Sequence, residues 1–410
     1  MGDYSAIRIN ATRLEESIRT MGQVGLDKGS GKRSRLALTD EDKAGRDLLC
    51  KWMREAGLEV KIDAIGNIFG VRAGSDTDAL PIMMGSHIDS VRNAGMFDGV
   101  YGVLGALEVI RTLNDNNITT KRPLVVTAFT NEEGARFQLD MMGSIYYAGV
   151  MPLDKLYAVT DDKGLTAEAE LKRIGYCGCE SVPVGNYFEL HIEQGPKLDA
   201  EGLDIGIVEG IQGLTWWQVE YCGEANHAGS TPMELRKDTL MAAAETAVAA
   251  EALINKLGHA SVVTVGRIRT EPDVINIVPG KCIFTVDFRQ PDSDILERGR
   301  CALEILFEQT AEKRGLTCTY KRLASVAPVK FDHTMVSLVE SKAQELALST
   351  KRMYSGASHD AQFICPMCPS AMIFVPSAKG LSHCPEEWTD FLDIANGCDV
   401  LFQSVAALSE

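Results

Sequence analysis

Three residues that could bind a metal ion or carry a proton fall within one short stretch of the chain. His87 and Asp89 stand in GSHID, and Asp98 follows in the glycine-flanked loop GMFDG. The stretch opens as an apolar strand and closes as an apolar helix, a junction where open α/β sheets bind ligands. A carboxylate beside a histidine can accept the second ring proton and fix the tautomer. The spacing suits a metal site, although a loop histidine with two solvated acids would look the same.

A second acidic motif follows another apolar run. Glu132 and Glu133 come directly after LVVTAFTN, so both would emerge at the carboxyl edge of a sheet. One carboxylate could bind a metal while the other handles a proton of the bound water. Taken alone, the pair is better interpreted as two acids stabilised at the start of a helix.

Two histidines far along the chain complete the set. His191 lies in FELHIE, where we expect it on the same strand face as Glu189 and Glu193, with the intervening residues in the core. His383 lies in a turn before a proline. Each alone is weak evidence, because a lone histidine is usually structural. Together with the two earlier motifs they form a histidine and carboxylate set that fits two divalent ions about 3.5–4 Å apart.

Helix and strand signals alternate around these motifs. Apolar runs bounded by turn residues or charges predict buried strands at LPIMMGS, LVVTAFT, YFELHIE and AMIFVP. Strands interleaved with helices predict an α/β fold with a mostly parallel sheet. The middle of the chain instead follows the order strand–helix–strand–strand–helix–strand, which is typical of a ferredoxin-like α+β unit. We therefore expect one domain formed by residues 1–213 and 326–410, with a second domain inserted at 214–325.

Composition narrows the class of protein. The chain has 410 residues and a net charge of −16, which argues against nucleic acid or an anionic membrane as a partner. No apolar run approaching the roughly 18 residues of a membrane span, and no signal peptide, is visible. Eleven cysteines without a secretion signal indicate reduced thiols in the cytoplasm.

Eight motifs occur in an order that resembles a known family: GSHIDSVRNAGMFDGVYGVL, TNEEGARF, LHIEQG, NHAGSTPM, INIVPG, DFR, SGASHDAQ and GLSHCPEEW. The chain is similar over nearly its whole length to the N-carbamoyl-L-amino-acid hydrolase, β-ureidopropionase and allantoate amidohydrolase group of di-metal aminopeptidase-like enzymes. The resemblance implies a metal-dependent amidohydrolase with a catalytic domain of the di-zinc aminopeptidase-like type. Its expected substrate is a small ureido carboxylate.

The resemblance leaves several functions open. The leading expectation is hydrolysis of N-carbamoyl-L-amino acids to the L-amino acid, ammonia and carbon dioxide. Allantoate amidohydrolase and β-ureidopropionase are the nearest alternatives. A dipeptidase or aminoacylase on the same fold, or a metal-free binding protein, is more distant.

The resemblance also implies roles for individual residues. Two divalent ions per subunit are expected, zinc or manganese, with cobalt or nickel possible. Five residues would hold them: His87 and His191 one ion, Glu133 and His383 the other, and Asp98 both. Glu132 would be the general base, and Asp89 the partner of His87. The family usually has two glycines where this chain has Ala94 and Gly95, for which we expect a local backbone adjustment and retained metal binding.

A further set is expected to serve the substrate: Gln194, Gln212, His227, Asn276, Arg289, Gly356 and His359. The planar fork of Arg289 suits bidentate binding of a carboxylate. A histidine or asparagine donor, His227 or Asn276, could stabilise an oxyanion. The inserted domain can pack against a copy of itself in a homodimer. The resemblance implies that His227 could reach the neighbouring subunit's site. His359 and Asp360 could contact the substrate or support the site.

Overall fold

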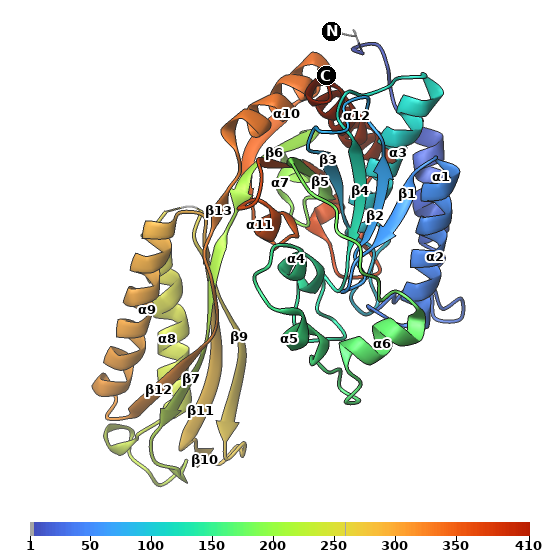
Figure 1. Ribbon diagram of the computed structural model, residues 1–410. Coiled ribbons are helices and arrows are strands. Elements are labelled where there is room, and N and C mark those ends of the chain that lie inside the picture. Colours follow the sequence, from blue (N-terminus) through green and yellow to red (C-terminus); the bar gives the residue numbers. More distant parts are fainter. Residues whose placement is uncertain (1–3, 259) are drawn as a thin grey trace. The chain divides into compact units, whose positions relative to one another are not determined.

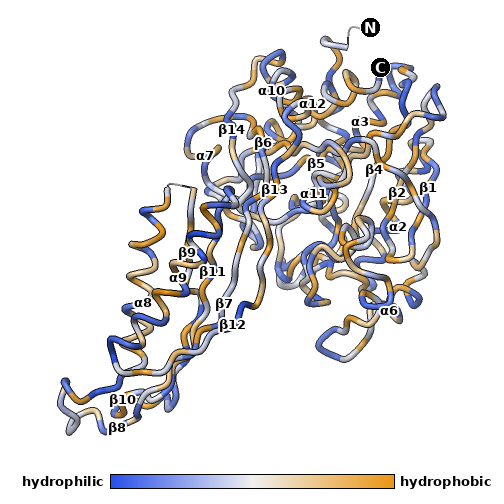
Figure 2. The backbone as a smooth tube through the Cα atoms, turned by 60° about the vertical axis from the view of Figure 1, so that its left-hand side comes forward, coloured by the Kyte–Doolittle hydropathy of each residue, from blue (hydrophilic) through white to orange (hydrophobic). Residues whose placement is uncertain are grey.

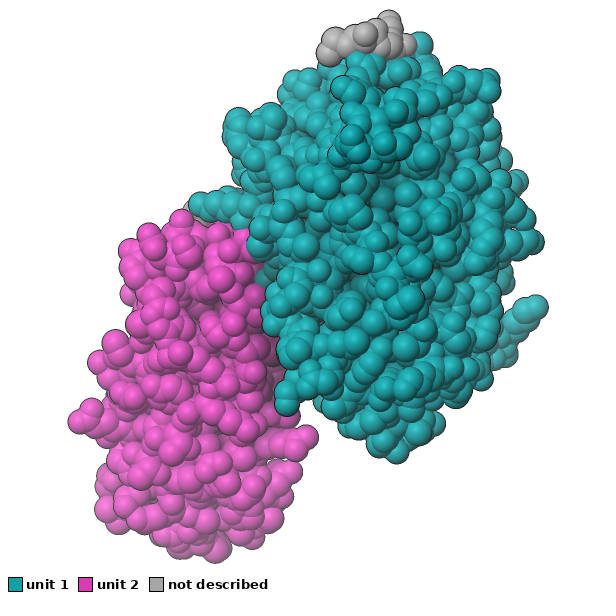
Figure 3. Space-filling view, viewed as in Figure 1, with its two compact units in different colours: residues 1–210, 330–410 teal, residues 211–329 magenta. Residues whose placement is uncertain are grey.

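The computed structural model describes residues 4–258 and 260–410 (Figure 1). The chain divides into two compact units, Met1–Gly210 with Lys330–Glu410 (unit 1) and Ile211–Val329 (unit 2), coloured separately in Figure 3. The insertion expected at 214–325 lies inside unit 2, which extends slightly further at both ends. Where the chain first passes from unit 1 to unit 2, only Gln212 separates two consecutive strands. No turn in the sequence therefore marks this boundary.

Unit 1 is built on a nine-stranded mixed sheet. Its centre is parallel, as predicted, and consists of β4 (Leu124–Phe129), β3 (Ile82–His87), β5 (Asn186–Ile192) and β15 (Ser370–Val375). Antiparallel strands extend both sides: β1 (Glu59–Ile62) and β2 (Ile68–Arg72) beside β4, and β6 (Ile205–Ile211) beside β15. Strands β13 (Val329–Lys330) and β14 (Thr350–Ser355) both pair with β6. The fold class predicted from the sequence is confirmed.

Burial explains why the central strands are apolar runs rather than alternating patterns. Every residue of β3, β4 and β15 is buried, as expected for strands covered on both faces. Helix α3 (Val100–Asp115) packs on β3 and β5, and α12 (Phe391–Leu408) packs on α3 and β15. The other helices of unit 1 are α1 (Ala11–Met21), α2 (Asp40–Glu55), α4 (Met142–Tyr147), α5 (Leu153–Tyr157), α6 (Ala167–Ile174), α7 (Lys197–Glu201), α10 (His333–Glu345), α11 (Ala361–Ile364) and the 3-10 turn η2 (Ala378–Gly380).

Helix α12 departs from the expectation that no apolar run approaches the length of a membrane span. By length and composition alone it could cross a membrane, with a mean hydropathy of 1.3 over 18 residues, and Figure 2 shows its hydrophobic stretches. However, 56% of it is buried, and it packs against α3, α10 and β15. These are the surroundings of a core helix.

Unit 2 has the ferredoxin-like arrangement that the element order predicts. Its antiparallel sheet has the order β12 (Thr317–Val326), β7 (Gly213–Cys222), β11 (Lys281–Gln290) and β9 (Val262–Glu271). Helices α8 (Thr239–Ile254) and α9 (Ser293–Lys313) pack on it around an apolar core that includes Trp217, Phe284 and Phe307. A short ribbon of β8 (Asn226–His227) and β10 (Ile277–Val278), with the turn η1 (Met233–Leu235), completes the unit.

Candidate active site

The candidate ligands come from the carboxyl ends of parallel strands and from the loops that follow them. His87 is the last residue of β3, and His191 lies one residue before the end of β5. Glu132 and Glu133 lie in the loop after β4, and Asp98 lies just before α3. Because parallel strands end at a common edge, residues distant in sequence meet there.

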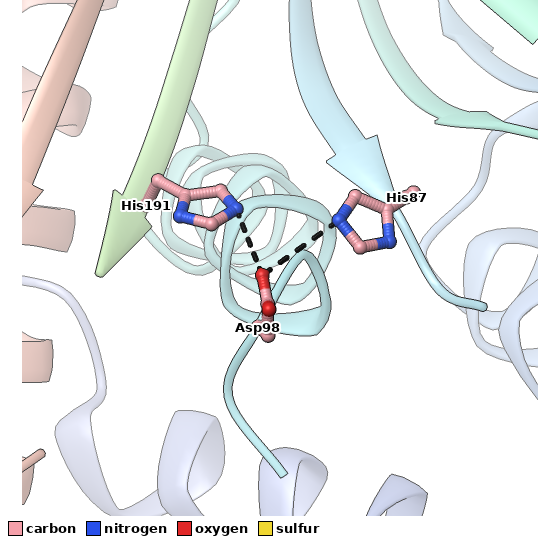
Figure 4. Close-up of side chains that lie close together, drawn as sticks. All are labelled: His87, Asp98 and His191. Carbon is pink, nitrogen blue, oxygen red and sulfur yellow. Dashed lines mark ion pairs between the residues drawn. The ribbon is translucent and has the colours of Figure 1, made fainter. Parts of the chain in front are cut away.

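Asp98 lies at the centre of this group. Its Oδ1 is 3.3 Å from Nε2 of His191 and 3.8 Å from Nε2 of His87 (Figure 4). Its Oδ2 is 3.1 Å from Nε2 of His383, which in turn lies 3.3 Å from Oε2 of Glu133. The structure thus forms two three-residue groups that share Asp98, each with its ligand atoms within 4.8 Å of one another. These are the five residues that the resemblance proposed as metal ligands.

The two glutamates face different neighbours. Oε2 of Glu132 lies 3.3 Å from Nε2 of His87, whereas Oε2 of Glu133 lies 3.3 Å from Nε2 of His383. Asp89 accepts hydrogen bonds from the backbone N–H of Glu132 at 3.2 Å and of Glu133 at 3.3 Å. One buried carboxylate therefore fixes the loop that carries both glutamates.

Asp89 contacts His87 differently from the expectation. Nδ1 of His87 lies 3.0 Å from the backbone carbonyl oxygen of Asp89 and 3.9 Å from its carboxylate. The backbone carbonyl can fix the tautomer with Nε2 free for a ligand. The carboxylate is used instead to order the glutamate loop.

Gly99 allows the close approach of the Asp98 loop to the histidines. It has a φ of +65°, and a Cβ there would overlap the ring of His87. Its N–H lies 3.3 Å from Nε2 of His191. Any larger residue would be strained in its backbone and would displace a ligand.

Burial and mutual repulsion dominate the electrostatics of the site. Burial lowers the pKa of His87 to about 4, so this imidazole is neutral near pH 7. Burial also raises the pKa of Glu132 and Glu133 well above the usual range, and the neighbouring carboxylates raise both further. For Asp98, hydrogen bonds to His191 and His383 outweigh burial and hold its pKa well below the usual range. Crowded buried carboxylates of this kind are what divalent cations stabilise.

Several buried polar atoms of the described residues lack a hydrogen-bond partner in a way that fits bound ions. Within residues 4–258 and 260–410, Nε2 of His87 and Oε1 of Glu133 are buried and accept or donate no hydrogen bond. Such buried atoms normally have partners. Imidazole nitrogens and carboxylate oxygens are ligands for zinc, manganese, cobalt and nickel. The residues present therefore fit a pair of divalent ions.

Three further site residues surround His191 and Asp98. The Gln194 side chain donates to Oδ2 of Asp98 at 3.0 Å. The ring of His359 lies 4.5 Å from that of His191, and its Nε2 lies 2.9 Å from the hydroxyl of Ser355. His359 is only 1% exposed, a placement that supports His191. Asp360 is fully buried beside it.

Glu189 and His191 share a strand face that is buried, not polar. Both are at most 1% exposed. Glu189 accepts hydrogen bonds from the Ser86 hydroxyl at 2.7 Å and from the N–H of Ala361 at 2.8 Å. Helix α11 covers this face and supplies the second of these bonds.

The remaining predicted residues belong to other elements, most of them in unit 2. His227 and Asn276 meet at the β8–β10 ribbon of unit 2, where Ala228 donates to the Asn276 carbonyl at 2.9 Å. Arg289 lies on β11 and donates to the Asp287 carboxylate at 2.9 Å. Gln212 separates β6 from β7, and Gly356 follows β14.

One buried acid was not among the predicted site residues. Glu387 belongs to the same GLSHCPEEW motif as His383 and accepts a hydrogen bond from the N–H of Asp98 at 3.3 Å. Its neighbour Glu386 is exposed. Residue type alone does not distinguish the two, and the motif was the only signal that pointed to this segment.

Comparison with known proteins agrees with this geometry. The model of peptidase family M20/M25/M40 matches residues 73–407. The chain belongs to this family. It is accordingly a hydrolase that acts on amide bonds, as the motifs predicted, and the M20 family generally uses two metal ions.

Relatives within the family cover the chain almost completely. N-carbamoyl-L-amino-acid amidohydrolase of Rhizobium meliloti is 41% identical, over 98% of this chain and 97% of that protein. Allantoate amidohydrolase of Escherichia coli is 32% identical, over 95% of each. The crystal structure of an amidase of the hydantoinase/carbamoylase family from Burkholderia multivorans superposes with a TM-score of 0.95 at 40% identity, over 98% of this chain and 99% of that one.

Proposed function

We propose that the protein hydrolyses N-carbamoyl-L-amino acids to the L-amino acid, ammonia and carbon dioxide, with two divalent ions per subunit. The observation that carries this proposal is the sharing of Asp98 between two ligand groups, with Glu132 beside one of them. This arrangement matches metal-assisted hydrolysis, in which one carboxylate handles the proton of the attacking water. The name of the Rhizobium meliloti relative supports a carbamoyl substrate.

His87 and His191 would hold one ion, Glu133 and His383 the other, and Asp98 both. Bound divalent ions of this kind supply an acidified water and a polarised carbonyl. Glu132 would take the proton of the water that adds to the ureido carbonyl. It would return that proton to the nitrogen of the C–N bond that breaks.

Neighbouring residues would keep the base and the ligands in place. Asp89 holds the Glu132 loop by two backbone N–H groups. His359 packs against His191, so we assign it to ligand support. Gln194 donates to Asp98 and could also face the substrate.

Residues of unit 2 would bind the substrate carboxylate and the oxyanion. Arg289 presents a guanidinium that Asp287 already orients by bonds of 3.2 and 2.9 Å. A substrate carboxylate could bind the same planar fork in bidentate fashion. His227 and Asn276 would stabilise the oxyanion from the β8–β10 ribbon.

A homodimer through unit 2 would bring these residues to a neighbouring site. Helix α8 exposes Met241 at 49% and Val248 at 71%. Strand β9 is at the edge of its sheet, so its outer edge has no strand partner among the described residues. Exposed apolar residues beside an unpaired sheet edge are typical of a protein interface. All eleven cysteines are free, which suits the cytoplasm.

Ammonia release from a panel of substrates tests the proposed specificity. The panel contains N-carbamoyl-L-amino acids and their D-forms, N-carbamoyl-β-alanine, allantoate and N-acetyl amino acids. We expect ammonia from the N-carbamoyl-L-amino acids and little from allantoate. Preference for allantoate would retain the mechanism and change the substrate, whereas inactivity on every ureido compound would favour a peptidase.

A further inference from the structure

Glu387 is a buried carboxylate that contacts the backbone of the shared ligand. It is 3% exposed. Its Oε1 accepts hydrogen bonds from the N–H of Phe97 at 3.1 Å and of Asp98 at 3.3 Å. Its Oε2 accepts a hydrogen bond from the hydroxyl of Ser382 at 2.9 Å. The carboxylate therefore uses both oxygens and has three donors.

These contacts join two loops that carry candidate ligands. Phe97 and Asp98 lie in the loop before α3, and Ser382 directly precedes His383. The Ser382 hydroxyl also lies 3.5 Å from Oδ2 of Asp98. Glu387, which is not among the candidate ligands, thus links the backbone of Asp98 to the residue that precedes His383. Partners of this kind orient ligands and tune metal binding.

The loop before α3 is shaped to receive this carboxylate. A Cβ at Gly95 would overlap Oε1 of Glu387. Ala94 is buried, and its backbone pairs with Arg33. The structure accommodates the Cβ of Ala94, whereas a Cβ at the next position would overlap Glu387. Alanine at position 94 is therefore compatible with the site.

We propose that Glu387 is a positioning residue that holds Asp98 and His383 at the spacing needed to bind the second ion. This inference rests on the proposed two-metal function. Glu387 touches neither the reacting atoms nor an ion. It acts through the backbone of Asp98 and through Ser382.

Metal titration of the full-length protein tests this role. Manganese binding to the chelator-treated protein is measured by calorimetry for wild type, Glu387→Ala, Glu387→Gln and the exposed neighbour variant Glu386→Ala. We expect two ions in wild type and Glu386→Ala, and an affinity for the weaker ion about 10–100-fold lower in Glu387→Ala. Glutamine keeps an oxygen acceptor for the two N–H groups, so Glu387→Gln should remain within about threefold of wild type.

The outcomes separate the inference from the proposed function. Wild-type protein that binds no manganese would overturn both. Two ions in wild type and unchanged affinity in Glu387→Ala would overturn only the role of Glu387. A merely structural role would lower the melting temperature of the metal-free protein without a selective loss of one ion.

The Gly95→Ala variant keeps Glu387 in the chain and provides a second test if Glu387→Ala folds poorly; where Glu387→Ala folds, the two changes form a double-mutant cycle. Gly95→Ala should weaken binding of the second ion because its Cβ displaces Glu387. In the Glu387→Ala background the same change should have little additional effect. Equal effects of Gly95→Ala in both backgrounds would contradict the proposed contact. The Ala94→Gly variant serves as the adjacent control and should bind metal like wild type.

Discussion

His227 and Arg289 lie at opposite ends of unit 2. His227 is in the β8–β10 ribbon, which adjoins the start of β11 at Lys281. Arg289 is eight residues beyond Lys281 on β11, a length of about 27 Å at about 3.4 Å per residue. One unit 2 cannot place both side chains on a single small substrate, so in the proposed dimer His227 would come from one subunit and Arg289 from the other.

Complementation between two inactive variants should reveal this arrangement. His227→Ala and Arg289→Ala should each lose most activity when expressed alone. Co-expressed, they should regain about a quarter of wild-type activity, because half of the dimers are mixed and one of their two sites is intact. Activity would be measured as ammonia release from an N-carbamoyl-L-amino acid. No recovery in verified mixed dimers would contradict a site built from two subunits.

The adjacent glutamates should respond differently to the same substitution. Glu132→Gln should lower kcat by about 10²–10⁴-fold and keep two bound ions, because it removes only the proton carrier. Glu133→Gln should lose one of the two ions, because Glu133 pairs with His383 in the second ligand group. Metal content by plasma mass spectrometry and ammonia release separate the two roles. Full activity in Glu132→Gln would exclude it as the base.

Helix α8 should control the oligomeric state. Val248→Glu places a charge on its exposed apolar face and should convert a dimer into a 44.6 kDa monomer. The matched control is Val150→Glu in unit 1, where the side chain is 61% exposed. Light scattering after size exclusion measures both masses. A fully active wild-type monomer would contradict the dimeric site.

Asp63 should make stability depend on pH. This carboxylate accepts hydrogen bonds from Asn67, whose Oδ1 in turn accepts the N–H of Thr130 next to the glutamate loop. Burial raises its pKa from 3.8 to about 7. Between these two pKa values, the folded protein keeps a proton that the unfolded chain releases. The contribution of Asp63 to the free energy of unfolding is therefore present at low pH and is lost as pH rises through 7.

Comparison with Asp63→Asn isolates this effect. The free energy of unfolding of metal-free wild type, relative to the variant, should fall by about 2–3 kcal/mol between pH 5 and pH 8. Urea unfolding at both pH values in the presence of chelator measures it. A difference between the two proteins that does not change with pH would show that Asp63 is ionised throughout.

The sequence could predict the elements because their signals are local. The apolar runs that end at His87 and surround His191 mark β3 and β5, and the order of elements marks the inserted unit. Thr39 caps α2 by accepting the N–H of Asp42, as its position before the helix predicts. The five candidate ligands were found because each occurs in a motif.

Contacts between distant segments could not be predicted in the same way. The polar face expected for Glu189 is buried because α11, from far along the chain, covers it. The carboxylate of Asp89 bonds the Glu132 loop and not the ring of His87, which depends on how two loops pack. Glu387 is distinguished from Glu386 only by its burial. The opposite placement of His227 and Arg289 follows from strand register, which motif order does not encode.

The most direct test of the account is metal-dependent ammonia release from an N-carbamoyl-L-amino acid. The protein is stripped with chelator, assayed, and assayed again after addition of manganese or zinc, with Asp98→Ala treated in parallel. We predict no ammonia from the stripped protein, recovery on metal addition, and no recovery in the variant that lacks the shared ligand. Undiminished activity in stripped protein, or in Asp98→Ala, would contradict a metal centre built around Asp98.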